Sequence, residues 1–316
     1  ADTGPACLSL CQDVQGETFD YPEEFFKERI HNIRRPKPDD FQIKQAMEKI
    51  KKSKKPIIIS GGGVFYSDAM DELGSFAIKH NIPVTQTVMG YSTMKRDHSH
   101  FLGPIGGLGG RAANNLAKET DLAICVGTKL ADFTTGSWAN FENPEFKLVS
   151  INIARHDANK HLAEAVIGDA KVCLSELSNS LGNWKSPDSW HKKSQDELKS
   201  WNEYVDKESG PTNQETPNYA HAVGAIYRNS DPTDIAVTAA GGLVGEVVQV
   251  WRPKELNTHE TEWGFSCMSY EISGALGIKM ANPDKDVIAF VGDGSYLLNN
   301  SDIYSSVLTN NKLIII

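Results

Sequence analysis

The sequence predicts an α/β protein with two parallel-sheet domains. Short apolar runs rich in Val and Ile alternate with longer segments whose apolar residues recur at helical spacing. The length of 316 residues suggests about two domains. Between Asn183 and Thr216 the composition changes, because aromatic residues there stand among Lys, Asp, Glu and Ser. Strands that alternate with helices form parallel sheets through right-handed crossovers.

The first half of the chain is expected to hold a connecting segment and one domain. Residues 1–38 begin with a short apolar strand, Ala6–Leu10, and continue as a polar connection. A regular α/β pattern fills residues 39–182, and Leu102–Gly110 is a glycine-rich loop within it. Its expected strands are Pro56–Ser60, Ile82–Thr87, Asp121–Gly127 and Lys147–Ile153. Its expected helices are Phe41–Lys51, Ala69–His80 and Arg111–Glu119.

The second half is expected to hold a linker and a second domain. Residues 183–216 read as a loop and a helix between domains, in which Trp184, Trp190 and Trp201 form interdomain packing. Residues 217–316 follow as the second α/β series, and the loop around His259 precedes its central helix. The expected strands are Asp234–Ala239, Val287–Val291 and the apolar run 312–316. The expected helices are Asn218–Asn229, Val244–Val250, Cys267–Met280 and Asn300–Thr309.

The apolar run at the end of the sequence also bears on completeness. A parallel strand that is buried on both faces is normally followed by a loop and more structure. The sequence starts without Met and stops at Ile316 within such a run. We therefore expect the chain to be an internal piece of a longer protein, with its second domain truncated at the C-terminal end.

Composition excludes several classes of function. The formal net charge is −9, and Lys51–Lys55 is the longest basic run, so no nucleic-acid partner is expected. No apolar stretch approaches the roughly 20 residues of a membrane helix, so no membrane partner is expected. The five cysteines are scattered, which favours reduced thiols and a cytoplasmic protein. Cys125 and Cys267 lie in apolar contexts and are expected in the core.

Two glycine clusters in the first domain favour a structural interpretation. Gly61–Gly63 follows a strand and precedes a helix, but a third glycine at dinucleotide-site spacing would fall at Tyr66. A tight strand-to-helix turn is therefore favoured over a phosphate site. Gly107, Gly109 and Ala112 match a permissive form of the same motif, but the residues before them do not resemble a strand. We expect a surface or interface loop there.

A third cluster favours a ligand site. Gly292, Asp293, Gly294 and Ser295 directly follow the strand Val287–Val291 and precede a helix. Ligands of open α/β sheets gather at the carboxyl ends of the strands. The glycines would let a diphosphate approach the backbone, and the carboxylate could hold Mg²⁺. The alternative is an Asp-Gly turn in which Asp293 caps the helix, and the four residues alone leave the two interpretations nearly even.

The surrounding segments resemble the cofactor-binding domain of thiamine-diphosphate enzymes. Gly241–Gly242 ends an earlier strand, and Trp263–Met268 opens an apolar helix before the Gly-Asp-Gly motif. The resemblance implies that residues 1–38 hold the end of the family's pyrimidine-binding domain and a linker, before a Rossmann-like central domain and an incomplete thiamine-diphosphate-binding domain. It further implies that Asp293 binds Mg²⁺ and that other residues surround the cofactor. Those implied to contact the cofactor are Gly241, Gly242, Leu243, Cys267, Met268, Gly292, Gly294 and Ser295.

The resemblance also implies a reaction. The phrases Cys7–Glu17, Asp132–Thr135 and Ser266–Glu271 depart from the acetolactate synthases and resemble a hydrolase branch of the family. That branch is implied to cleave the C–C bond of a cyclic 1,2-dione, giving a deoxy sugar acid in myo-inositol breakdown. The implied assembly is a homo-dimer or tetramer. An acetolactate synthase-like lyase and a non-catalytic nucleotide-binding module are the alternatives.

The catalytic residues stay unknown at this stage. The glutamate that protonates the cofactor ring in this family belongs to a domain outside the chain, and the closing Asn ligand of the metal falls after Ile316. We therefore expect the 316-residue chain to be inactive by itself.

Overall fold

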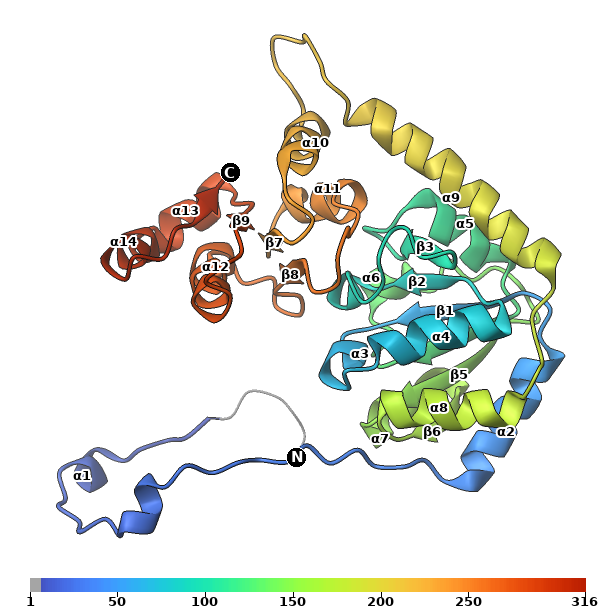
Figure 1. Cartoon of the computed structure of the whole chain (residues 1–316), viewed down its shortest axis with the longest axis horizontal. Coiled ribbons are helices and arrows are strands. Elements are labelled where there is room, and N and C mark those ends of the chain that lie inside the picture. The colour runs from blue at the N-terminus through green and yellow to red at the C-terminus, as the bar shows by residue number, and fades with distance from the viewer. Residues whose placement is uncertain (1–6) are drawn as a thin grey trace.

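A six-stranded sheet forms the first half of the molecule. The computed structural model describes residues 7–316 (Figure 1). The strand order is β3-β2-β1-β4-β5-β6, and every neighbouring pair is parallel. The strands are β1 Pro56–Ser60, β2 Val84–Gln86, β3 Phe101–Pro104, β4 Leu122–Val126, β5 Lys147–Asn152 and β6 Glu164–Ile167. The order runs outward from β1 and β4 in both directions, which confirms the α/β class and its doubly wound topology.

Helices cover this sheet and bury its central strands. The side chains of Ile57–Ile59 and of Ala123–Val126 are fully buried, as continuous apolar runs in parallel sheets require. Helices α2 and α4 both pack against α8, and α5 packs against α9. The longer helices are α2 Asp40–Lys52, α4 Met70–His80, α5 Arg111–Glu119 and α8 Ala170–Leu181. The short ones are α3 Gly63–Tyr66, η2 Val88–Gly90, α6 Asp132–Thr135, α7 Arg155–Ala158 and η3 Lys160–Leu162.

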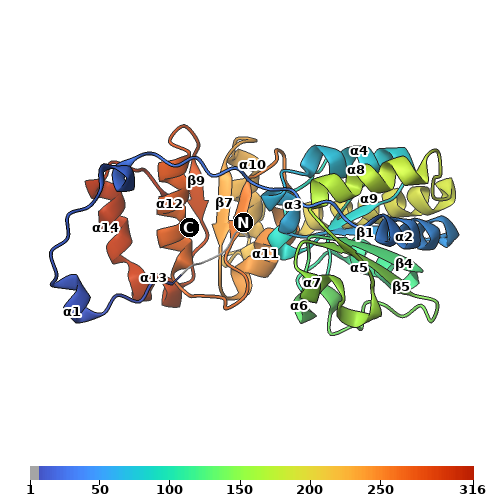
Figure 2. The ribbon, with the colours of Figure 1, turned by 90° about the horizontal axis from the view of Figure 1, so that it is seen from below.

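A four-stranded parallel sheet forms the second half, in the order β10-β9-β7-β8. Its strands are β7 Ile235–Thr238, β8 His259–Thr261, β9 Val287–Ala289 and β10 Ile314–Ile315. Its helices are α10 Tyr219–Asn229, α11 Gly242–Val250, α12 Tyr270–Ala281, α13 Asp293–Asn299 and α14 Ser301–Leu308. Figure 2 shows this unit beside the first one. An apolar cluster from both units, which includes Val88, Val244 and Val248, joins them.

Helix α9, Asp188–Glu208, packs mainly on the first unit and also contacts α10 of the second, as expected for a segment between two domains. The indole N–H of Trp190 donates to the carbonyl of Pro56 in β1 at 2.9 Å. Trp190 and Trp201 are both buried in the large apolar core, which also takes in Val223 and Tyr227 of the second unit. Trp190 therefore fixes α9 onto the sheet, because a buried indole needs both apolar contact and a hydrogen-bond acceptor.

The N-terminal segment differs from its prediction. Residues 7–10 form no strand and are exposed, while Ala6 lies outside the described residues. A strand requires a neighbour for its backbone groups, and none pairs with residues 7–10 in the described part of the chain. Two short helices, α1 Gln12–Gln15 and η1 Glu23–Phe26, follow and are also exposed.

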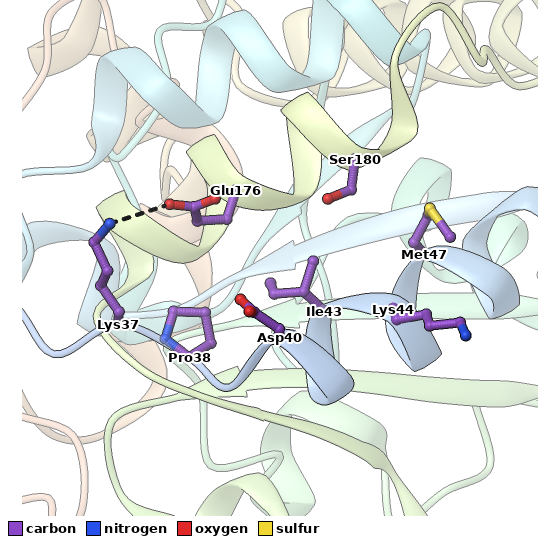
Figure 3. A pocket seen from close by; sticks show the side chains of 8 residues that line it. All are labelled: Lys37, Pro38, Asp40, Ile43, Lys44, Met47, Glu176 and Ser180. Carbon is purple, nitrogen blue, oxygen red and sulfur yellow. Dashed lines mark ion pairs between the residues drawn. The ribbon is translucent and has the colours of Figure 1, made fainter.

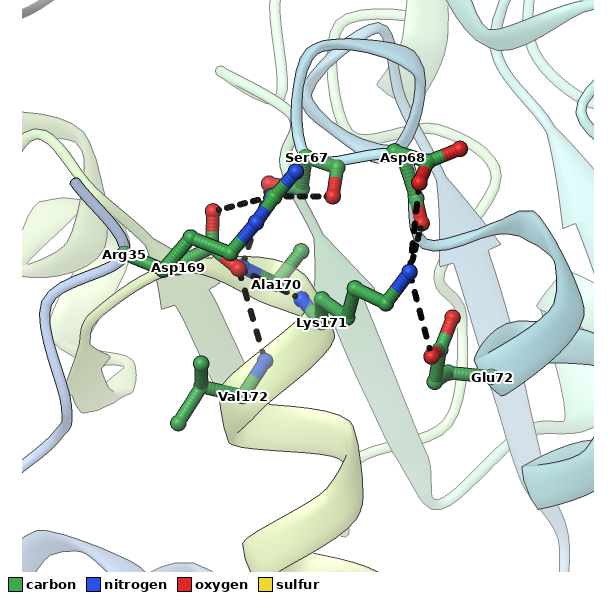
Figure 4. A network of polar contacts seen from close by, with 8 residues as sticks. All are labelled: Arg35, Ser67, Asp68, Glu72, Asp169, Ala170, Lys171 and Val172. Atoms are coloured by element: carbon green, nitrogen blue, oxygen red, sulfur yellow. Dashed lines mark hydrogen bonds and ion pairs between the residues drawn. The ribbon is translucent and has the colours of Figure 1, made fainter. Parts of the chain in front are cut away.

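Polar contacts attach the next stretch of chain to the first unit. Figure 4 shows Arg35 between the carbonyl of Ser67 and the carboxylate of Asp169, which is 3.1 Å away. Asp169 also caps α8 by accepting from the backbone N–H groups of Lys171 and Val172. One buried carboxylate therefore fixes both a helix start and the connecting segment.

The glycine clusters of the first unit have the structural role that was expected. A Cβ on Gly61 would lie 2.4 Å from the carbonyl oxygen of Gly127, and one on Gly63 would lie 2.6 Å from its Cα. A Cβ on Gly106 would lie 1.9 Å from the carbonyl oxygen of Phe133. Backbone segments approach so closely at these glycines that no room is left for a ligand. No helix in the described range 7–316 is long and apolar enough to cross a membrane.

Candidate functional site

The candidate site lies where two neighbouring strands of the second sheet end. In the parallel register of β7 and β9, Ile235 faces Val287 and Val237 faces Ala289. The segments after Thr238 and after Ala289 therefore leave the same edge of the sheet side by side. Both segments lead into helices, α11 and α13. This is the edge at which ligands of open α/β sheets bind.

Two glycines at this edge face open space, unlike Gly61, Gly63 and Gly106 of the first unit. Cβ atoms built on Gly241 and on Gly292 would meet no heavy atom within 4 Å among residues 7–316, their chain neighbours aside. Gly241 has a φ of +81°, which glycine adopts without the cost other residues incur. The bare backbone therefore leaves room that a bound group could fill.

Asp293 is exposed at the first position of α13. Its Oδ1 accepts from the N–H of the adjacent Gly294 at 2.8 Å. That contact is local and occupies the N–H of Gly294, but Asp293 is not the helix cap of the alternative interpretation, since the N-cap residue is Gly292 and no side chain caps the helix. Its second oxygen accepts no hydrogen bond from the described residues. The side chain therefore keeps acceptor capacity toward solvent.

Glu271 is buried beneath the same edge and was not singled out as a site residue from the sequence. Its Oε1 accepts from the backbone N–H of Ala240 at 3.1 Å and from the hydroxyl of Ser295 at 3.3 Å. Its Oε2 has no hydrogen-bond partner among residues 7–316, although Glu271 has no exposed surface. The sequence signal that could have identified it is a charged residue, Glu271, in the first turn of the mainly apolar helix α12.

The segment before α12 is braced by Glu262. Its two oxygens accept from the backbone N–H groups of Phe265, at 3.2 Å, and Cys267, at 2.6 Å. The carbonyl of Cys267 accepts from the N–H of Tyr270. Both backbone groups of Cys267 are thus engaged within the protein. Its side chain is exposed, which corrects the expectation of a core thiol.

Met268 lies against the Gly-Asp-Gly segment. A Cβ added to Gly294 would come within 2.8 Å of the Met268 Cε atom. The structure therefore brings together two residues that the sequence assigned to one site from segments far apart in the chain. Nearby, burial and the negative charges of Glu260 and Glu262 raise the pKa of Tyr270 to about 12, so its hydroxyl stays protonated at neutral pH.

His259 lies in β8 rather than in a loop and faces the first unit. Its ring is buried and contacts the ring of Tyr91 edge-to-face, with centroids 5.2 Å apart. Burial lowers the pKa of His259 to about 4, so the imidazole is neutral at physiological pH. This histidine therefore belongs to the contact between the two sheets.

Two other features of the described residues do not add to this site. A groove of about 420 Å³ lies between α2 and α8 in the first unit, crossed by the ion pair of Lys37 and Glu176 at 3.6 Å (Figure 3). No group of three or more His, Cys, Asp or Glu side chains in residues 7–316 is arranged to hold a metal by itself. A cation at Asp293 would therefore need ligands from the bound group or from water.

Family comparisons agree with this geometry. The family model "Thiamine pyrophosphate enzyme, central domain" matches residues 43–177, and "Thiamine pyrophosphate enzyme, C-terminal TPP binding domain" matches residues 239–316. The two models together cover more than half of the chain, and the chain belongs to the thiamine pyrophosphate enzymes.

Curated relatives are similar along nearly the whole chain. A 3D-(3,5/4)-trihydroxycyclohexane-1,2-dione hydrolase of Clostridium botulinum is 38% identical over 99% of this chain and 52% of its own length. The proteins of the same name from Clostridium tetani and Bacillus anthracis are each 39% identical over 99% of the chain and 52% of their own length. The chain thus spans about half the length of these relatives.

Proposed function

We propose that this chain supplies the central and cofactor-binding parts of a thiamine-diphosphate- and Mg²⁺-dependent hydrolase that opens a cyclic 1,2-dione. The observation that carries the proposal is the open glycine backbone at Gly241 and Gly292 beside the exposed carboxylate of Asp293. The relatives named as trihydroxycyclohexanedione hydrolases support the substrate class.

The residues present fit the diphosphate end of the cofactor. Gly241 precedes α11, which begins with Gly242 and Leu243, and Gly292 precedes α13, whose first turn holds Gly294 and Ser295. Two helix starts would thus offer backbone N–H groups to an anion, although the N–H of Gly294 would first have to leave Asp293. We propose that the free oxygen of Asp293 holds Mg²⁺, an ion that prefers oxygen ligands and bridges phosphates. Cys267 and Met268 would line the cofactor's ring end.

The proposed reaction divides its work between cofactor and protein. Bound thiamine diphosphate would supply the carbanion chemistry needed to break a bond between two carbonyl carbons. In the net reaction, the hydroxyl of water ends on one of these carbons as a carboxylic acid, and a proton ends on the other. The chain's own part is to hold the diphosphate and its cation in a fixed place. We further propose a homo-oligomeric, cytoplasmic enzyme.

Asp293 and Asp286 provide a matched test of the cation site. The two carboxylates flank β9 at opposite ends, and Asp286 pairs with Lys312 at 3.2 Å instead of facing the site. We expect Asp293→Asn to abolish the Mg²⁺-dependent part of thiamine diphosphate binding in the complete protein, and Asp286→Asn to leave it unchanged. Calorimetric titration with and without Mg²⁺ measures both. Binding that is indifferent to Mg²⁺ and to Asp293→Asn would contradict the proposal.

Product analysis tests the substrate class. The complete enzyme should convert the cyclic dione to an open-chain acid and should not condense pyruvate. Formation of acetolactate from pyruvate, without turnover of the dione, would favour an acetolactate synthase-like enzyme instead. Absence of any thiamine diphosphate binding would favour the non-catalytic module.

A further inference from the structure

The buried carboxylate of Glu271 connects three separate segments at the candidate site. It lies in the first turn of α12, while its Oε1 accepts from Ala240, in the turn after β7, and from Ser295, in the helix after β9. The partners are 31 and 24 residues away in sequence. One oxygen atom therefore sets the spacing between the two glycine-bearing segments.

Such a carboxylate is costly for folding alone. Glu271 has no exposed surface, and its Oε2 has no partner among the described residues. A buried charge with an unsatisfied oxygen destabilises a fold unless a donor or a cation completes it. An apolar residue would avoid the cost of Oε2 but would leave the N–H of Ala240 and the hydroxyl of Ser295 without this acceptor, so the glutamate serves the two segments that it connects.

We infer that Glu271 is a positioning residue for the diphosphate end of the cofactor. Its Oε1 fixes the turn at Ala240 relative to the hydroxyl of Ser295, and a bound diphosphate would lie against these two segments. Its Oε2 would then gain a donor, for which a water molecule of the cation is suited, since Mg²⁺ usually keeps several waters. This inference rests on the proposed function and adds a residue to its site.

Two substitutions at Glu271 test whether its hydrogen bonds matter for cofactor binding. Glu271→Gln keeps one carbonyl oxygen that can accept from Ala240 and Ser295, whereas Glu271→Ala removes both contacts. In the complete protein we expect the alanine variant to bind thiamine diphosphate with Mg²⁺ at least 10-fold more weakly, and the glutamine variant to recover most of this loss. Ser295→Ala, which breaks only one contact, should fall between wild type and Glu271→Ala.

Asp234 offers a matched control. It is also a buried carboxylate of this sheet, but it accepts from the N–H of Asp231 before β7, at the opposite end of the strand. Asp234→Asn should lower the melting temperature without changing the dissociation constant for thiamine diphosphate. Hydrogen exchange provides a readout other than binding: Glu271→Ala should speed exchange in the peptide around Ala240 and leave the peptide around Asp234 unchanged.

The outcomes distinguish this inference from the proposed function. If Glu271→Ala is folded and binds the cofactor as wild type does, while Asp293→Asn does not bind, the positioning role is wrong and the proposed function stands. If the alanine variant does not fold, Ser295→Ala and Glu271→Gln decide, and wild-type dissociation constants in both would overturn the inference. If wild type itself fails to bind, the proposed function is wrong.

Discussion

Replacing Gly292 by alanine tests whether the open backbone at the sheet edge is a ligand site. The residue has φ −74° and ψ 155°, which any amino acid adopts, and a Cβ there would meet no heavy atom within 4 Å among the described residues. Folding therefore gives no reason for a glycine at this position. The substitution should change the free energy of unfolding by less than about 1 kcal/mol. The change should be stabilising, because alanine reduces the conformational entropy of the unfolded chain.

Cofactor binding should respond in the opposite way. A methyl group at Gly292 would fill the space in which we place a phosphate, and the charge-assisted hydrogen bonds lost would each be worth about 1.5–3 kcal/mol. Because 1.4 kcal/mol corresponds to a tenfold change, the dissociation constant should rise roughly 10- to 100-fold. Calorimetric titration of the complete protein with thiamine diphosphate at saturating Mg²⁺ measures this change, and urea denaturation measures stability.

Gly277 provides the control for this experiment. It is exposed in α12, and a Cβ there would also meet no heavy atom within 4 Å among residues 7–316. Gly277→Ala should stabilise the helix by roughly 0.5–1 kcal/mol and leave binding unchanged. Wild-type affinity in a folded Gly292→Ala variant would refute the placement of the diphosphate, whereas weakened binding in both variants would indicate an indirect effect.

Three further expectations concern the remainder of the fold. Gly106→Ala places a Cβ 1.9 Å from the carbonyl oxygen of Phe133, at a φ of +105°. Gly182→Ala is the control, because Gly182 also has a positive φ but faces open space, and it should lower the free energy of unfolding in urea by roughly 1–2 kcal/mol. Gly106→Ala should cost several times as much, and equal losses would disprove the clash. Trp190→Phe should cost roughly 1–3 kcal/mol in the same assay, since a buried carbonyl loses its donor, and an unchanged midpoint would disprove that bond. For His259, the folded pKa of about 4 lies below the unfolded value of 6.5, so stability is full above pH 6.5 and declines as the pH falls toward 4. His259→Phe should flatten this decline by on the order of 3 kcal/mol, and an unaltered slope would assign the decline to other groups.

Most strands of the fold follow from local sequence, and the exceptions have identifiable causes. The Val- and Ile-rich runs of β1 and β4 fall where they are predicted, because a parallel strand buried on both faces needs continuous apolar residues. β3 is missed because Gly103 and Pro104 disfavour strands, yet an edge strand tolerates a residue without an N–H group. β6 and β8 are missed because their four and three residues, Glu164–Ile167 and His259–Thr261, form runs too short to show a period.

The site is less accessible to sequence reasoning because its contacts span long stretches of chain. Gly61 and Gly241 each begin a strand-to-helix turn, and local sequence treats them alike. They differ in what lies opposite, since the backbone of Gly127 closes the first and nothing within 4 Å in the described chain closes the second. Likewise, the role of Glu271 depends on Ala240, which only the pairing of β7 with β9 brings beneath the same edge.

The charges at this edge give a physical reason for a cation beside the proposed diphosphate. Asp293 is exposed beside the proposed diphosphate, and Glu271 lies buried beneath it. A carboxylate and a diphosphate repel one another, most strongly where solvent screens their charges least. Helix N-termini at α11 and α13 each contribute only about half a positive charge. Thiamine diphosphate and a divalent cation should therefore bind with strong positive coupling, each tightening the dissociation constant of the other by the same factor.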